Sequence, residues 1–288
     1  MRTWREVNED NCFGLAAQLA FYFALALFPA LIFVVALGSY FPRTVMDDVL
    51  AALQPVAPAE VVTLIRTQLD SILAAEQGGL LTVGVLGAVW SSSGALTAII
   101  DALNRAYDIE ESRPWWKVRL IAVVLTIGLA LFILTAFTLV VAGPEMASGL
   151  AERFGLGRAF ALAWMVVQWP FVLALVTFAI AVTYYVAPDA EQDWVFLTPG
   201  SVSATLLWLA ASLGFRAYVQ NWADYNATYG ALGGAIVLLL WLYVSGLVLL
   251  VGGELNAEIE HASPKGKAPG ERRPGQRRRL RAFARAET

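Results

Sequence analysis

The acidic residues Glu254 and Glu258 are the first groups in this chain of 288 residues that could carry chemistry. They lie four residues apart, so a helix would place both carboxylates on one face. Glu254 closely follows a long apolar segment, where a carboxylate is costly. It could bind a proton or a cation, form an ion pair with Arg105 or Arg113, or mark the end of the segment. The sequence leaves these alternatives open.

Other polar groups lie within or beside apolar segments. The serine run 91–93, next to Trp90, could line a cavity or allow close helix packing. Arg216 could reach the membrane surface, face a cavity opposite Asp224, or attract an anionic headgroup. We expect the lining or gate of a central cavity to consist of Trp90, Ser91, Ser92, Ser93, Asn104, Arg216, Tyr225 and Glu254.

The sequence offers few of the residues and motifs that bind metal ions or nucleotides. The single cysteine, Cys12, excludes an internal disulfide, and the single histidine, His261, argues against a zinc centre built from histidines. The chain contains no GxxxxGK[ST] loop for phosphate binding, so ATP-driven work by this chain alone is not expected. We expect no metal, no cofactor and no enzymatic activity.

The elements that must position these groups are six stretches without any charged residue, namely 11–42, 77–100, 120–144, 159–188, 194–215 and 225–253. Each holds an apolar core of roughly 18 residues or more, about the length that a helix needs to cross a bilayer. The hydrophobic fraction of 58% exceeds that of a soluble domain. We therefore predict an all-α polytopic membrane protein with six transmembrane helices, at about 16–40, 80–100, 120–141, 159–186, 195–215 and 231–251.

The distribution of Lys and Arg gives the orientation. These residues gather at the N-terminus, after the second span and in the C-terminal tail, which places both termini in the cytoplasm. Residues 1–261 form the predicted six-helix transmembrane domain. Residues 262–288 are predicted to be a disordered basic tail that contacts the anionic inner leaflet, and no nucleic acid is expected as a partner.

Several local features are also predicted. Apolar residues at helical spacing between 61 and 73 indicate an amphipathic helix in the first extracytoplasmic loop, lying on lipid or against neighbouring loops. Pro29 and Pro170 should kink the first and fourth spans. The second span should continue as a helix through Arg105, which can pair with Asp101. Residues 143–157 are expected to form an outer loop.

Four blocks of the sequence form a distinctive combination. The first is LAFYFALALFPALI, from residue 19, and the second is WSSSGALTAIIDALNRAY, from residue 90. The third, residues 185–200, ends in Pro-Gly, and the fourth contains LLLWLYVSGLVLLVGGELNAEIE. Together they resemble the YihY/BrkB family of bacterial inner-membrane proteins, once labelled ribonuclease BN. Gly253 stands where that family more often has alanine.

The resemblance implies a six-helix protein of the bacterial inner membrane with a role in envelope integrity or lipid traffic. Our leading hypothesis is a transporter or lipid-handling protein without ATPase activity. The alternative is a non-catalytic envelope scaffold, and a ribonuclease is the third reading. Membrane lipids are the expected partners, and self-association into a homo-oligomer is left open.

Overall fold

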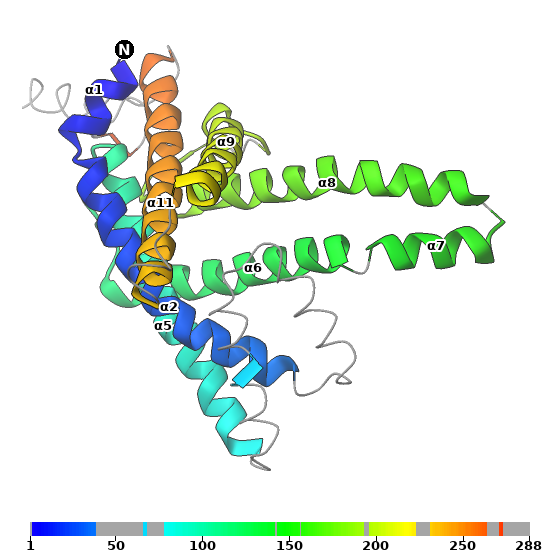
Figure 1. Cartoon of the computed structure of the whole chain (residues 1–288). Coiled ribbons are helices and arrows are strands. Elements are labelled where there is room, and N and C mark those ends of the chain that lie inside the picture. Colours follow the sequence, from blue (N-terminus) through cyan, green and yellow to red (C-terminus); the bar gives the residue numbers. More distant parts are fainter. Residues whose placement is uncertain are drawn as a thin grey trace, which may run out of the picture.

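The computed structural model describes residues 2–38, 66–67, 78–141, 143–155, 157–192, 196–222, 231–263 and 271–272. Within these ranges the regular elements are all helices, without a strand, which confirms the all-α prediction for this part of the chain (Figure 1). They are α1 (Arg2–Glu9), α2 (Cys12–Gly38), α5 (Gly78–Ala106), α6 (Trp115–Val141), α7 (Gly143–Arg153), α8 (Gly157–Val186), α9 (Pro199–Trp222) and α11 (Ala231–Ala262).

Each of the six charge-free stretches lies largely in one long helix, and these helices are α2, α5, α6, α8, α9 and α11. By length and composition, three helical segments of the described chain can cross a membrane: Trp115–Val140, Leu162–Val186 and Gly233–Ala262. A fourth is available if the bent pair Thr3–Glu9 and Cys12–Leu27 counts as one span. The six-span count, the side of the termini and the tail therefore stay predictions.

Local chemistry explains where several helices begin. The Thr198 hydroxyl accepts a hydrogen bond from the Ser201 amide, and the Ser201 hydroxyl accepts one from the Thr198 amide, both at 3.1 Å. This reciprocal cap closes the first turn of α9, whose first residue, Pro199, has no amide hydrogen to satisfy. The helix therefore begins four residues after the predicted start of the fifth span. Pro114 directly precedes the first residue of α6.

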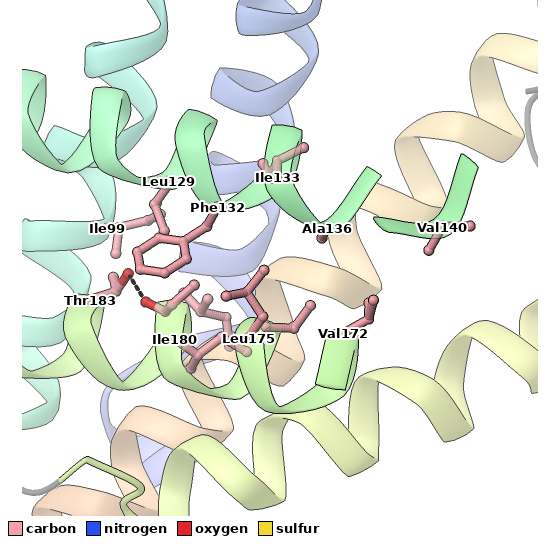
Figure 2. Close-up of a pocket in the computed structure, with 13 residues that line it drawn as sticks. Ile99, Leu129, Phe132, Ile133, Ala136, Val140, Val172, Leu175, Ile180 and Thr183 are labelled. Atoms are coloured by element: carbon pink, nitrogen blue, oxygen red, sulfur yellow. Dashed lines mark hydrogen bonds between the residues drawn. The ribbon is translucent and has the colours of Figure 1, made fainter. Parts of the chain in front are cut away.

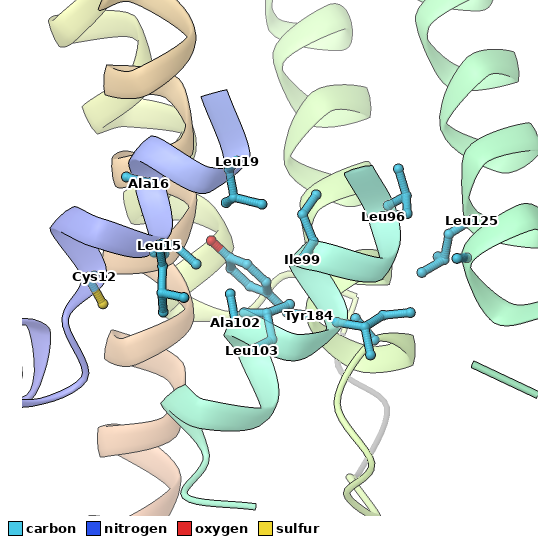
Figure 3. Packing of buried hydrophobic residues seen from close by; sticks show 14 of the residues in the cluster. Cys12, Leu15, Ala16, Leu19, Leu96, Ile99, Ala102, Leu103, Leu125 and Tyr184 are labelled. Atoms are coloured by element: carbon cyan, nitrogen blue, oxygen red, sulfur yellow. The ribbon is translucent and has the colours of Figure 1, made fainter. Parts of the chain in front are cut away.

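The buried core lies where α2, α5, α8 and α11 meet (Figure 3). Leu19 of α2, Leu103 of α5 and Leu250 of α11 are each almost fully buried there. The Tyr184 side chain of α8 reaches into this core, and its hydroxyl donates a hydrogen bond to the Leu249 carbonyl. That bond satisfies the one polar atom of a side chain that is otherwise packed in apolar surroundings.

The helices α9 and α11 approach each other through two glycines. A Cβ added at Gly200 would collide with the Gly252 carbonyl oxygen, and a Cβ added at Gly252 would lie 2.5 Å from the Tyr184 hydroxyl. The Asn256 side chain fixes the contact, because its Oδ1 accepts a hydrogen bond from the Gly200 amide at 2.8 Å. Small residues and one amide thus join two helices at short range.

The α6–α7–α8 hairpin extends away from α2, α5 and α11, with α7 at its far end (Figure 1). The expected outer loop at 143–157 is wrong for most of its length, because residues Gly143–Arg153 are helical. Pro144 near the start, Glu145 in the first turn and Arg153 in the last turn all favour a helix at these positions. The glycine and proline content of the segment concealed this pattern.

Candidate functional site

An apolar groove separates α6 from α8 along the hairpin (Figure 2). Its volume is about 520 Å³. The side chains that line it come mainly from these two helices, with one each from α5 and α11 at its base: Ile99, Leu129, Phe132, Ile133, Ala136, Val140, Val172, Leu175, Val176, Ala179, Ile180, Thr183 and Leu249. On α8 the lining runs from Val172 to Thr183, roughly 16 Å of helix.

The chemistry of the groove is almost entirely that of hydrocarbon. Thr183 is the one lining residue with a hydroxyl group, and that hydroxyl already donates to the Ala179 carbonyl at 2.9 Å. Figure 2 shows this bond, together with the Phe132 ring between the two helices. A ligand in the groove would therefore meet methyl and aromatic groups rather than hydrogen-bonding partners.

A second site is a loop clasp that joins the segments following α5 and α8. Asn104 is 2% exposed, and its amide nitrogen donates to Glu111 Oε2 at 2.8 Å. Its amide oxygen accepts a hydrogen bond from the Asp189 backbone at 2.7 Å. Asn104 therefore links two loops that are far apart in sequence, and it does so with both ends of its side chain.

Charged groups complete the loop clasp around Asp189. Its carboxylate accepts hydrogen bonds from the Ser112 amide at 3.1 Å and the Ser112 hydroxyl at 2.5 Å. Arg113 lies 2.6 Å from Glu111 and 3.7 Å from Asp189. Arg272 of the C-terminal segment approaches Asp189 at 3.6 Å and donates to the Glu110 carbonyl. Arg272 of the tail thus contacts this face.

The loop clasp should weaken in acid. Partial burial raises the pKa of Glu111, but hydrogen bonds from Arg113 and Asn104 outweigh it and hold that pKa below its ordinary value. Because the pKa is depressed in the folded state, the stabilisation is present above about pH 4.5 and is lost as the pH falls through the folded value. We expect unfolding temperatures between pH 6 and pH 3 to fall more steeply for the wild type than for Glu111→Gln. Equal slopes would contradict this.

Glu254 occupies a buried position between α11 and the start of α2. It is 2% exposed, and the Cys12 thiol donates to its Oε1 at 3.4 Å. The Asp10 carboxyl group lies within interaction range of the Glu254 carboxyl group. The suggested arginine partners lie elsewhere, since Arg105 pairs with Asp101 at 2.9 Å and Arg113 belongs to the loop clasp. The Asp101–Arg105 pair is confirmed.

The three serines of the run 91–93 lie in different environments. Ser91 is exposed, Ser92 is half-buried, and buried Ser93 donates to the Trp90 carbonyl at 2.7 Å. The exposed Trp90 ring lies under the Arg119 guanidinium, 4.1 Å from its centroid, in a cation–π contact. These groups bond within α5 and to α6, and none of them lines the groove.

The remaining candidates are also dispersed. Arg216 is exposed on α9, while Tyr225 and Asp224 lie outside the described residues. Glu254 and Asn104 are buried in different sites. The helices α2 and α8 continue past Pro29 and Pro170, and the predicted kinks stay predictions. The structure therefore does not bring the described candidates into one cavity, and the common gate stays a prediction.

Sequence reasoning missed three features of the site. The groove is made of ordinary apolar residues, which carry no signal in a membrane helix. Neither Asp10 nor Asn256 was singled out as a candidate, although Asn256 follows Glu254 by two residues. Gln168 of α8 is 6% exposed, and its Oε1 has no partner within the described chain.

The fold and these sites define a helical membrane protein with a hydrocarbon-lined groove. The profile of the family described as Virulence factor BrkB matches residues 3–276, and the chain therefore belongs to that family. This confirms the resemblance identified from the four sequence blocks.

Several relatives cover most of the chain. It is 40% identical over 245 residues to the ribonuclease-like protein YfkH of Bacillus subtilis, covering 84% of this chain and 88% of the relative. It is 27% identical to a UPF0761 membrane protein of Tolumonas auensis, with 89% and 83% covered. A UPF0761 membrane protein of Aeromonas salmonicida is 26% identical, with 88% and 86% covered. No solved structure matches the chain.

Proposed function

We propose that this chain is a lipid-handling or transport protein of the bacterial inner membrane without ATPase or other enzymatic activity, and that the α6–α8 groove receives an acyl chain. The single observation that carries the proposal is the hydrocarbon lining of the groove. Because its one hydroxyl is already bonded within α8, a polar substrate would lose hydrogen bonds to water without replacement. An acyl chain loses none.

The dimensions of the groove support the same ligand. Its length along α8 is about 16 Å, roughly half of the 30 Å hydrocarbon core and so comparable to one leaflet. At about 520 Å³ it lies in the range of ligand-binding pockets. At its base the groove reaches Ile99 and Leu249, so an acyl chain inserted there would contact α5 and α11 as well as the hairpin.

Filling the groove tests the proposal. Ala179 lines the groove on α8, and Ala179→Phe would place a ring in the space of the acyl chain. We expect crosslinking of a C16 fatty acid with a mid-chain diazirine, mapped by mass spectrometry, to fall on α6 and α8 of the wild type. The crosslinking yield on these helices should drop about tenfold or more in the variant, since several methylene contacts are lost.

The matched control is Ala163→Phe, the same change at an exposed position of α8 outside the groove. It should leave the crosslinking pattern unchanged. Both proteins are also reconstituted in liposomes to compare scrambling of a fluorescent phospholipid. Crosslinks spread evenly over all lipid-facing helices, unaffected by Ala179→Phe, would refute the groove as a binding site and favour a scaffold.

The name of the Bacillus relative suggests RNA hydrolysis as a second activity to test. Among the described residues, no group of three or more His, Cys, Asp or Glu side chains could hold a metal ion. The residue of choice for a test is Glu254, the buried carboxylate. Metal-dependent RNA cleavage that disappears in Glu254→Gln would support a nuclease and count against our proposal.

A further inference from the structure

A sharp elbow joins the first two helices. The axes of α1 and α2 differ by 66° across the break at Asp10 and Asn11. Asn11 adopts a left-handed conformation with a φ of 53°, which allows the chain to turn between two helices. On the inside of the elbow α1 packs against α11, and Val7 of α1 is 1% exposed. The bend at the elbow therefore places α1 against α11.

The carboxyl pair, Asp10 and Glu254, lies at this elbow. Asp10 belongs to the elbow itself, and Glu254 projects from α11, so the interaction of these two carboxyl groups links the two sides. The Cys12 thiol donates to the same Glu254 carboxyl from the first turn of α2. Opening the elbow would break both contacts and expose Cys12.

The surroundings of the carboxyl pair are acidic. The titratable groups that interact with it come from α1, α2 and the segment after α5, and they are Glu6, Glu9, Cys12, Tyr107 and Asp108. Glu258 of α11 acts on Glu6 rather than on the pair. The nearby cation, Arg5, pairs with Glu9 on the exposed side of α1. Within the described chain, no Lys or Arg forms an ion pair with Glu254.

A hydrogen bond between the two carboxyl groups requires a proton. Two ionised carboxylates have only acceptor atoms, and neighbouring carboxylates repel each other. One protonated group can donate to the other, which removes one negative charge from a site without a counter-ion. The closed elbow is therefore compatible with one proton on the pair and strained without it.

We propose that the α1–α2 elbow is a pH-sensitive switch, in which a proton shared by Asp10 and Glu254 holds α1 against α11 and its loss releases α1. The switch does not depend on what the groove binds. Each opening releases one proton to water, and no covalent bond other than that O–H bond is made or broken.

The direction of the response follows from burial. Desolvation raises the pKa of Asp10, and the charges of Asp108, Glu6 and Glu9 raise it further, while the hydrogen bond with Glu254 opposes the shift only in part. The closed elbow thus binds the proton more tightly than an open one. Closure is favoured at low pH, and it weakens as the pH rises from the ordinary carboxyl range near about 4 through the raised value.

The single cysteine provides the measurement. Cys12 is 1% exposed, so a maleimide reaches it only when the elbow opens. The full chain in nanodiscs is labelled between pH 5 and pH 9, and each rate is divided by that of free glutathione at the same pH. We expect the corrected rate of the wild type to rise about tenfold or more over this range.

Three variants identify the groups responsible. Glu254→Gln keeps the shape and supplies a permanent donor, so its corrected rate should stay low at every pH. Asp10→Asn should behave in the same way, and it provides the test if Glu254→Gln does not fold. Glu258→Gln, one turn further along α11, removes a charge outside the pair and should retain most of the pH response.

The proposal has clear ways to fail. A corrected wild-type rate that does not change with pH would overturn it. It would also be overturned if Glu254→Gln and Asp10→Asn folded and kept the full response, or if Glu258→Gln abolished it as completely as Glu254→Gln. Each of these results would leave the groove and its crosslinking experiment untouched.

Discussion

Replacing Gly200 with alanine is expected to destabilise the protein by about 3 kcal/mol or more. The new methyl group would collide with the Gly252 carbonyl and lie 2.5 Å from Asn256 Oδ1, so α9 must move away from α11. That movement breaks the hydrogen bond from the Gly200 amide to Asn256. Gly252→Ala meets Tyr184 and Ala204 from the other side of the same contact and should have a similar effect.

The measurement is the free energy of unfolding in mixed micelles, with increasing SDS and helix content followed by circular dichroism. Gly214→Ala is the matched control, because it lies on α9 and a Cβ there meets no atom within 4 Å. Alanine is the better helix former, so this variant should be neutral or stabilised by up to about 1 kcal/mol. Equal losses in Gly200→Ala and Gly214→Ala would show that the close contact does not stabilise the fold.

Asn104→Leu is expected to cost about 3 kcal/mol, the second large effect. Leucine has a similar volume, but it leaves the Asp189 amide without its acceptor and removes the Asn104 hydrogen bond to Glu111 Oε2, which keeps only Arg113. Both loops of the clasp would lose their shared anchor. Besides the unfolding free energy, faster hydrogen exchange at Asp189 and Ser112 should report the loosened loops.

Gln168→Leu is the matched control for this substitution. It also replaces a buried amide with leucine, but Gln168 Oε1 has no partner among the described residues, and nearby Trp164 Nε1 has none either. Removing an unpaired polar atom from an apolar site is close to neutral or mildly stabilising. If the two substitutions were equally harmful, the loss would reflect a leucine at a buried position rather than the hydrogen bonds of Asn104.

The long helices were predictable because a bilayer imposes a strict rule. Charge-free runs of this length have few structures other than a helix, since every backbone polar group must be paired internally. The tight α9–α11 contact is partly visible in the sequence as well, since Pro199-Gly200 and the GGELNA run are two of the four blocks that identify the family. What the sequence could not state is that these two blocks touch each other.

The sites were less predictable for a physical reason. Polar residues in apolar segments are conspicuous, so Ser93, Asn104 and Glu254 were singled out, but two of the three satisfy local structural needs. Ser93 bonds within its own helix, and Asn104 ties two loops. The groove depends on how α6 and α8 separate, and side-chain types alone do not encode that separation. The Asp10–Glu254 contact likewise needs the elbow, which brings together residues 244 positions apart.

The projecting hairpin has the geometry of a lever. The helices α6 and α8 meet α5, α9 and α11 at one end, and α7 lies at the other (Figure 1). Along α8 the lever arm is roughly 45 Å, so a rotation of about 5° at the base moves the far end by about 4 Å. Small adjustments near the loop clasp are thereby amplified with distance. Changes in bilayer thickness or lateral pressure act along the hairpin. A displacement that they cause at its far end would produce a displacement at the base that is smaller by the same ratio.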